Sequence, residues 1–195
     1  MNIFLVMVIA YMLGNISPAY ILGRKYKNLD IRKHGSGNAG TTNALRILGK
    51  KSAAIVFLVD MGKGLIAVQA GHLIAGYEGA LTAAVFVVIG HVFPVFLRFK
   101  GGKGIATTIG ALISLFPMVT LIATLFGVGV ILRTRIVSLG SLLGIAVLPL
   151  VLIGAGQDRQ GVITAAILAV LVIFTHRENI KRLMNKNERR LGEKR

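Results

Sequence analysis

The fold of this chain is decided by residues 104–132, which read GIATTIGALISLFPMVTLIATLFGVGVIL. This is the longest stretch without Asp, Glu, Lys or Arg, and it contains 29 residues. A single helix of that size would measure about 44 Å, well beyond the roughly 30 Å hydrocarbon core of a membrane. Pro117 lies near its middle, after Phe116, and proline breaks a helix interior. We therefore expect two short helices that meet at Phe116 and Pro117.

The overall composition is that of a membrane protein. Of the 195 residues, 54% are apolar and only 15% are charged, and the mean hydropathy is +0.74. A soluble domain carries about 25% charged residues, so the net charge of +16 does not indicate a soluble nucleic-acid binder. The apolar content also excludes a disordered basic tail. Because there is no Cys, disulfides, thiolate metal sites and Cys nucleophiles are excluded.

Other apolar stretches raise the expected number of transmembrane helices to seven. Asp60 and Lys63 interrupt one of them, and the first lacks a basic flank before it and is expected to be retained as a helix. Besides the two halves of 104–132, the stretches are 2–23, 51–71, 79–97, 136–156 and 161–175. The sequence therefore predicts an all-α, polytopic integral membrane protein.

The distribution of basic residues predicts the orientation. Four segments hold 21 of the 23 Lys and Arg residues: 24–51, 98–103, 133–135 and the tail from residue 177. Basic loops favour the cytoplasmic side, and seven spans place all four segments on one side, whereas six would separate them. We therefore expect the N-terminus outside and the C-terminus in the cytoplasm. Residues 1–195 are expected to form a single domain that ends in a basic cytoplasmic tail, 183–195.

The loop after the first span has a composition suited to an anion. Residues 34–46 read HGSGNAGTTNALR. Glycines allow backbone amides to turn toward an anion, hydroxyl and amide side chains add donors, and arginine offers a planar fork for phosphate. The alternative is a flexible cytoplasmic loop. The candidate phosphate contacts are Ser36, Gly37, Asn38, Thr41, Asn43 and Arg46.

A second glycine-rich stretch, FKGGKGIATT at residues 99–108, precedes an expected helix at the inner surface. Free amides and the positive helix end favour an anion there. The stretch is not a Walker A loop, because a glycine rather than Ser or Thr follows its lysine. The alternative is a glycine turn with lysines that reach the interface. The candidate substrate contacts are Gly101, Gly102, Lys103 and Gly104.

A third stretch, THRENIKRL at residues 175–183, carries the candidate catalytic pair. In a helix, His176 and Asn179 are three residues apart and share a face. Neighbouring cations disfavour the imidazolium, and a neutral histidine can accept a proton. The alternative is an amphipathic tail attracted to anionic lipid, which is our interpretation of the residues beyond Lys186.

Polar residues within the spans are expected to have structural roles. Asp60 and Lys63 are three apart and can neutralise each other, although a link to the inner site is the alternative. His91 and Pro94 suggest a helix kink and packing, with a contact to the site as the other option. Ser138 lies at an inner helix end, where it can cap the helix or bind a phosphate oxygen.

Taken together, these segments resemble the bacterial PlsY family of membrane acyl-phosphate:glycerol-3-phosphate acyltransferases. The resemblance extends over nearly the whole chain, and we see no departure at a motif position. Three stretches correspond to the family's signature motifs, namely 36–46, 101–107 and 176–183. Further stretches match family landmarks in the same order, namely 60–64, 91–96 and 138–140.

The resemblance implies transfer of a fatty acyl group from acyl phosphate to the 1-hydroxyl of sn-glycerol 3-phosphate. The products would be lysophosphatidic acid and inorganic phosphate, the first step of bacterial phospholipid synthesis. It also implies no metal or other cofactor, no nucleic acid partner, and an upstream enzyme that forms acyl phosphate. The active site would face the cytoplasm from the bacterial inner membrane. The His-x4-Asp motif of other glycerol-phosphate acyltransferases is absent from the sequence.

Acyl phosphate is already activated, so we favour direct attack by the glycerol hydroxyl without a covalent enzyme intermediate. His176 is the candidate general base, oriented by Asn179. A substrate phosphate oxygen, with a second pKa of about 6, is an alternative base. Ser36 as a nucleophile is a third route.

Two other classes of function compete with the enzyme. A small transporter of organic phosphates would use Asp60 and Lys63 near the membrane midplane. A lipid-binding or scaffold protein would not need Lys103 or Asn179.

Overall fold

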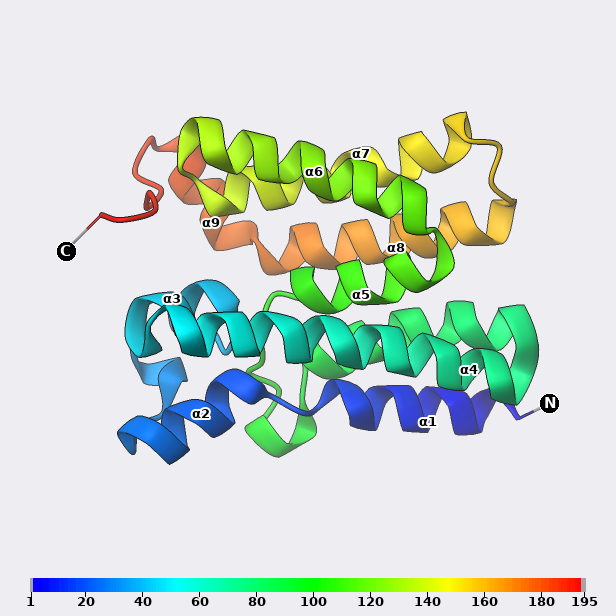
Figure 1. Ribbon diagram of the computed structural model, residues 1–195, viewed down its shortest axis with the longest axis horizontal. Coiled ribbons are helices and arrows are strands. Elements are labelled where there is room, and N and C mark those ends of the chain that lie inside the picture. Colours follow the sequence, from blue (N-terminus) through cyan, green and yellow to red (C-terminus); the bar gives the residue numbers. More distant parts are fainter. Residues whose placement is uncertain (1, 194–195) are drawn as a thin grey trace. The chain divides into compact units, whose positions relative to one another are not determined.

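The computed structural model describes residues 2–193, and this part of the chain contains helices and no strand, which confirms the all-α prediction. The chain divides into two compact units, Met1–Leu115 and Phe116–Arg195. Figure 1 shows the order of the helices, and each unit is described by itself.

Unit 1 begins with a helix that is broken after 12 residues. Asn15 terminates α1, and Pro18 occupies the first turn of α2, where its missing N–H is not needed. The elements of unit 1 are α1 Ile3–Gly14, α2 Pro18–Lys27, η1 Ile31–Lys33, α3 Thr41–Leu48, α4 Lys50–Val92, η2 Val95–Leu97 and α5 Ile105–Leu115.

The long element α4 folds back on itself. Ala75 and Gly76 have non-helical dihedral angles, and Gly76 has a φ of 62°, in the region that favours glycine. The backbones of Gly71 and Gly79 approach so closely that a Cβ on either would collide with the carbonyl oxygen of the other. Residues eight apart cannot touch in a straight helix, so α4 is a helical hairpin (Figure 1).

Glycines also bring the other helices of unit 1 against this hairpin. Gly14 of α1 packs against Gly90 in the second half of α4. In the first half, Gly64 packs against Thr107 of α5, and Gly110 of α5 meets the backbone of Met61. Small residues allow this close approach where apolar burial does not drive helix association. The α4 hairpin is therefore the core around which unit 1 is built.

Unit 2 contains four helices: α6 Pro117–Thr134, α7 Val137–Gly154, α8 Arg159–Thr175 and α9 Arg177–Met184. The run 104–132 is divided at the predicted place, because α5 ends at Leu115 and Pro117 begins α6. Gly127 and Gly140 bring α6 and α7 together. At the other end, α8 and α9 meet with a bend of 62°.

Several of these helices are long and apolar enough to cross a membrane. Within residues 2–193 they form four candidate spans, Ile3–Lys27, Lys50–Leu97, Pro117–Thr134 and Val137–Gly154, and a fifth if α8 and α9 form one bent span. The second contains the hairpin, and α5 has only 11 residues. Seven spans and the orientation of the termini therefore stay predictions.

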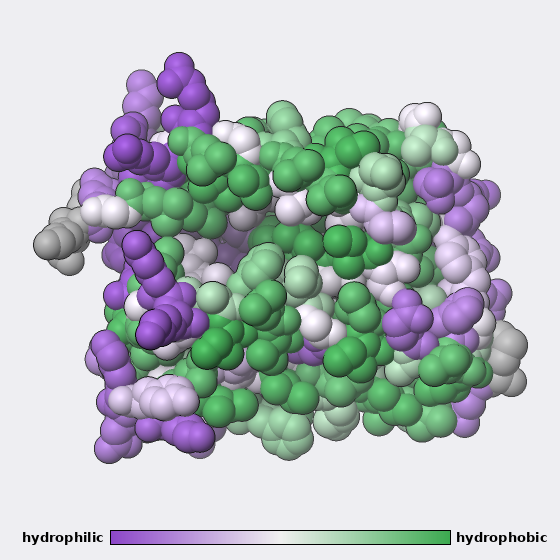
Figure 2. All heavy atoms as spheres, in the orientation of Figure 1, coloured by the Kyte–Doolittle hydropathy of each residue, from purple (hydrophilic) through white to green (hydrophobic). Residues whose placement is uncertain are grey.

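The surface of these helices is suited to lipid. Large apolar side chains are exposed along them, among them Leu73 at 86% and Leu132 at 76%. On the face seen in Figure 2, apolar residues cover the middle of the helices and hydrophilic residues gather near their ends.

Candidate active site

Asn43 organises the predicted anion-binding loop, residues 34–46. Its side chain is 1% exposed and lies at the start of α3. Its Nδ2 group donates to the carbonyl oxygens of Ile31 at 3.0 Å, His34 at 3.0 Å and Asn38 at 2.9 Å. Its Oδ1 atom accepts the Ser36 amide at 2.8 Å. These bonds satisfy the side chain, so in this structure Asn43 shapes the loop, and direct contact with substrate stays a prediction.

Two glycines make this arrangement possible. Gly35 has a φ of 63° and Gly37 a φ of 74°, and a Cβ on Gly35 would run into Oδ1 of Asn43. Ser36 lies between them and is half-buried. Asn38 also folds inward, with Nδ2 donating to the Ser36 carbonyl at 3.2 Å. Hydrogen bonds and left-handed glycines therefore shape the turn of this loop.

Asp30 and Arg32 anchor the beginning of this loop. The Asp30 carboxylate caps η1 and receives Nε and Nη2 of Arg32 at 2.9 Å and 2.7 Å. The hydrogen bond from Arg32 lowers the pKa of Asp30 to about 2 despite burial, and Asp30 in turn raises the pKa of Arg32. Nη1 of Arg32 donates to the Leu97 carbonyl at 2.7 Å. The sequence analysis did not single out either residue; their D-x-R spacing next to the loop was the available signal.

The second predicted stretch forms a turn, residues 101–104, in front of α5. Gly101 and Gly102 donate their amides to the carbonyls of Val92 and His91, both at 3.1 Å. A Cβ on Gly101 would collide with the His91 carbonyl and one on Gly102 with the His91 ring. Gly104 has a φ of 90°, and its carbonyl accepts the Thr108 amide at 2.8 Å as α5 begins. Glycine is required in this turn because backbone and ring leave no room for side chains.

Unit 1 brings these two stretches into contact. The Ala39 amide donates to the Gly101 carbonyl at 3.4 Å, across about 60 residues of sequence. Thr41 begins α3 and is half-buried, Arg46 is exposed, and Lys103 is half-buried. The first and second predicted motifs therefore belong to one local site.

In unit 2, one hydrogen bond sets which ring nitrogen of His176 carries the hydrogen. This residue lies at the junction of α8 and α9 and is 3% exposed. Its Nδ1 atom lies 2.8 Å from the Val172 carbonyl. A carbonyl only accepts, so Nδ1 carries the hydrogen and the lone pair of the neutral ring is on Nε2. Nε2 is therefore the atom that can accept a proton.

Asn179 and Ser138 converge on a carboxylate that the sequence analysis missed. Nδ2 of Asn179 donates to Oε1 of Glu188 at 2.6 Å, and Oγ of Ser138 donates to the same atom at 3.0 Å. Nε of Arg182 donates to Oε2 at 2.7 Å. We interpreted the chain beyond Lys186 as a membrane-attracted tail. The signal against that interpretation was an acidic residue in a basic segment, where Glu193 is the only other one beyond Lys186.

Glu188 is ionised in this setting. Burial on its own raises the pKa of the carboxyl, but the hydrogen bonds from Arg182, Asn179 and Ser138 together hold it below the ordinary value. Only 6% of the side chain is exposed. The ionised carboxylate can only accept, so Ser138 uses its one hydroxyl proton on Glu188. A contact between Ser138 and substrate stays a prediction.

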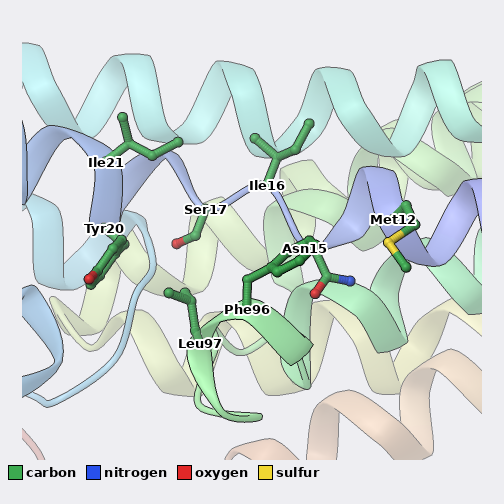
Figure 3. Close-up of a pocket in the computed structure, with 8 residues that line it drawn as sticks. All are labelled: Met12, Asn15, Ile16, Ser17, Tyr20, Ile21, Phe96 and Leu97. Carbon is green, nitrogen blue, oxygen red and sulfur yellow. The ribbon is translucent and has the colours of Figure 1, made fainter.

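A small pocket opens beside the break between α1 and α2 (Figure 3). Its volume is about 320 Å³, and most of its lining is apolar. Asn15 and Ser17 are its buried polar residues, and each has an oxygen without a hydrogen-bond partner. The lining residues are Met12, Asn15, Ile16, Ser17, Tyr20, Ile21, Phe96 and Leu97.

The structure thus joins the predicted residues in two groups. The first and second motifs meet in unit 1, and Ser138, His176 and Asn179 lie in unit 2. That the two groups form one site stays a prediction. Among residues 2–193, no three His, Asp or Glu side chains come together as metal ligands.

An all-helical protein with apolar spans and glycine-shaped, cationic loops fits the class of membrane enzymes that act on phosphorylated substrates. The sequence pattern of the glycerol-3-phosphate acyltransferase family matches residues 4–186. The chain belongs to this family, which confirms the resemblance to PlsY proteins.

Named relatives and solved structures agree. A glycerol-3-phosphate acyltransferase of Thermoanaerobacter sp. strain X514 is 49% identical, over 96% of this chain and 94% of the relative. One from Clostridioides difficile strain 630 is 43% identical, over 97% and 96%. The crystal structure of PlsY (YgiH), an integral membrane glycerol 3-phosphate acyltransferase, in its glycerol 3-phosphate form has a TM-score of 0.93 at 36% identity. It covers 98% of this chain and 96% of that one. The lysophosphatidic acid form gives a TM-score of 0.91 with the same coverage.

Proposed function

We propose that this chain transfers a fatty acyl group from acyl phosphate to the 1-hydroxyl of sn-glycerol 3-phosphate. The products are lysophosphatidic acid and inorganic phosphate. The chain works from the bacterial inner membrane with seven spans, its N-terminus outside, and its site facing the cytoplasm. An upstream enzyme that forms acyl phosphate supplies the donor, and no metal or other cofactor takes part.

The observation that carries the proposal is the contact between the 34–46 loop and the 101–104 turn in unit 1. Both are built from glycines whose positions are fixed by close packing or positive φ, and cationic side chains accompany both. Membership of the glycerol-3-phosphate acyltransferase family supplies the substrate class. The hydroxyl, amide and cationic side chains on these two segments suit phosphate.

We assign Ser36, Gly37, Asn38, Thr41, Arg46 and the turn with Lys103 to phosphate binding. Two substrates that both carry phosphate need two anion pockets close together. The side-chain donors and cations held on this backbone stabilise the charge that moves to the leaving phosphate as the acyl–oxygen bond breaks. The loop geometry supports this assignment because Asn43 and the glycines hold the backbone in place before any substrate binds.

The attacking hydroxyl forms its bond directly to the acyl carbon, and phosphate leaves with the electron pair of the broken bond. The proton of the hydroxyl goes to Nε2 of His176, and Asn179 helps to position the histidine. The hydrogen bond from Nδ1 to Val172 supports this role, because it leaves the lone pair on the other nitrogen. A substrate phosphate oxygen is the competing base.

The test uses the purified chain in detergent with acyl phosphate and radiolabelled glycerol 3-phosphate, without coenzyme A, acyl carrier protein or added metal. We expect labelled lysophosphatidic acid and an equal amount of inorganic phosphate. Folded protein that forms product only from acyl-coenzyme A would contradict the donor assignment. A burst of phosphate in the absence of glycerol 3-phosphate would contradict direct attack and favour a covalent intermediate on Ser36.

A further inference from the structure

A buried charged cluster lies under the 101–104 turn, and the proposed reaction leaves it without a role. Asp60, Lys63 and His91 are 1%, 4% and 5% exposed. Nζ of Lys63 lies 2.8 Å from Oδ1 of Asp60, which confirms the predicted pairing, and 2.9 Å from Nδ1 of His91. Buried charges are costly in a membrane unless they are paired, so three polar groups in one place require an explanation.

Lys63 also holds the break between α1 and α2. Its ammonium donates to the carbonyls of Gly14 at 3.0 Å and Ile16 at 2.6 Å, where the chain leaves the helix. Helix ends leave carbonyls without intrahelical partners, and Lys63 supplies donors for them. These two hydrogen bonds fix the ammonium in place.

His91 connects the cluster to the turn. Nδ1 of His91 lies 2.9 Å from Nζ of Lys63 and 3.3 Å from Oδ1 of Asp60, so the ring contacts both charged residues. The ring lies directly against Gly102, which has no room for a Cβ on that side. The His91 carbonyl accepts the Gly102 amide at 3.1 Å. The ring and backbone of one residue therefore support the turn.

The helix that bears Asp60 and Lys63 also fixes the other end of the turn. Gly64 packs against the backbone of Thr107, and Met61 against Gly110, both in α5. The turn, 101–104, runs from the His91 contact to the start of α5. The 60–64 segment consequently contacts what lies at both ends of the turn. Lys63 contacts His91, and Met61 and Gly64 contact α5.

We propose that Asp60, Lys63 and His91 act together as positioning residues, which hold the 101–104 turn in the conformation that receives a substrate phosphate. This inference rests on the proposed function. It gives the buried charges a role in substrate binding that goes beyond mutual neutralisation. A small displacement of such a turn is expected to weaken binding about 10- to 100-fold.

The decisive variant is Asp60→Asn with Lys63→Met, which removes both charges and leaves no unpaired buried ion. We expect the KM for the substrate whose phosphate the turn holds, glycerol 3-phosphate or acyl phosphate, to rise about 10- to 100-fold. The melting temperature should fall, because the carbonyls of Gly14 and Ile16 lose their donor. Gln69→Ala is the matched control. It removes a 2.7 Å hydrogen bond to Ser114 between the same two helices, α4 and α5, without touching the turn, and its KM should be unchanged.

A second pair of variants keeps the test valid if the double variant does not fold. His91→Ala should raise the same KM, and His91→Gln should restore most of it, because the amide oxygen can accept from Lys63. Wild-type protein that forms no lysophosphatidic acid would contradict the proposed function itself. Active wild type together with an unchanged KM for both substrates in folded Asp60→Asn/Lys63→Met, or in His91→Ala, would overturn the positioning role.

Discussion

His176 is placed by its own helix, through the 2.8 Å bond from Nδ1 to the Val172 carbonyl. The residue type and its place in the third motif were evident from the sequence, but the nitrogen that is left to accept a proton was not. That information depends on which acceptor lies next to the ring, and at the end of α8 this acceptor is the Val172 carbonyl, four residues earlier.

If Nε2 of His176 is the base, His176→Ala should lower kcat about 10²- to 10⁴-fold with little change in the KM for glycerol 3-phosphate. Steady-state kinetics on the purified variant measure both quantities. A loss of tenfold or less would instead favour a phosphate oxygen of the substrate as the base.

Glu188 accepts hydrogen bonds from three side chains at once, and removing its charge should lower the stability of the fold. Glu188→Gln can no longer accept from Ser138, Asn179 and Arg182 together, and such losses typically destabilise by about 1–3 kcal/mol. Thermal unfolding measures the effect. The control is Glu178→Gln, which makes the same charge change at an exposed carboxylate 3.6 Å from Lys181 and should have little effect. Equal melting temperatures for the two variants would argue against a structural role for Glu188.

At the scale of elements, close glycine contacts hold the helices of unit 1 together. Gly64→Ala places a methyl group against the backbone of α5, and backbone atoms cannot move aside as the end of a flexible side chain can. We therefore expect the free energy of unfolding to fall by about 1–3 kcal/mol. Gly62→Ala, two residues earlier in the same helix, meets nothing within 4 Å and should be neutral or stabilising by about 0.5–1 kcal/mol. Unfolding curves for the pair test this, and a similar loss in both would contradict the packing argument.

The connection from α2 to the 34–46 loop should respond to acid. Asp30 has a pKa of about 2 in the folded chain against an ordinary value of 3.8, so its ionised form stabilises the fold above about pH 4. That contribution is lost as the pH falls from about 4 toward 2. Asp30→Asn should therefore lower the melting temperature most at pH 6, and the difference from wild type should narrow below pH 4. A difference in melting temperature between the variant and the wild type that stays constant from pH 6 to pH 3 would contradict this role of Asp30.

For the whole molecule, the seven-span topology and the single-domain organisation remain predictions. The chain has no cysteine, so single introduced cysteines can report sidedness without background. In intact cells, a membrane-impermeant maleimide should label Glu78→Cys and Gln157→Cys. These positions lie between expected spans, 51–71 and 79–97 for the first and 136–156 and 161–175 for the second, on the side expected to be outside. Lys50→Cys and Arg133→Cys should react only after the membrane is opened. Labelling of Arg133→Cys in intact cells would exclude seven spans and support six.

The sequence by itself determined the helical class, the division at Pro117, the three motifs and the family. These follow from local chemistry: runs of apolar residues, a residue that cannot continue a helix, and short stretches in which glycines, donors and cations are adjacent. Asn43, Ser36 and Lys103 were identified as functional candidates for this reason, since each motif is contiguous.

Only the tertiary structure decided which partners those residues have. Asn43 turned out to bind its own loop, Glu188 took the donors of Ser138 and Asn179, and Lys63 and His91 came to support the 101–104 turn. Lys63 and His91 are 28 residues apart, and Ser138 and Glu188 are 50 apart. Hydrogen bonds and close packing act over a few ångströms in space whatever the separation along the chain, so folding alone brings such groups within reach of one another.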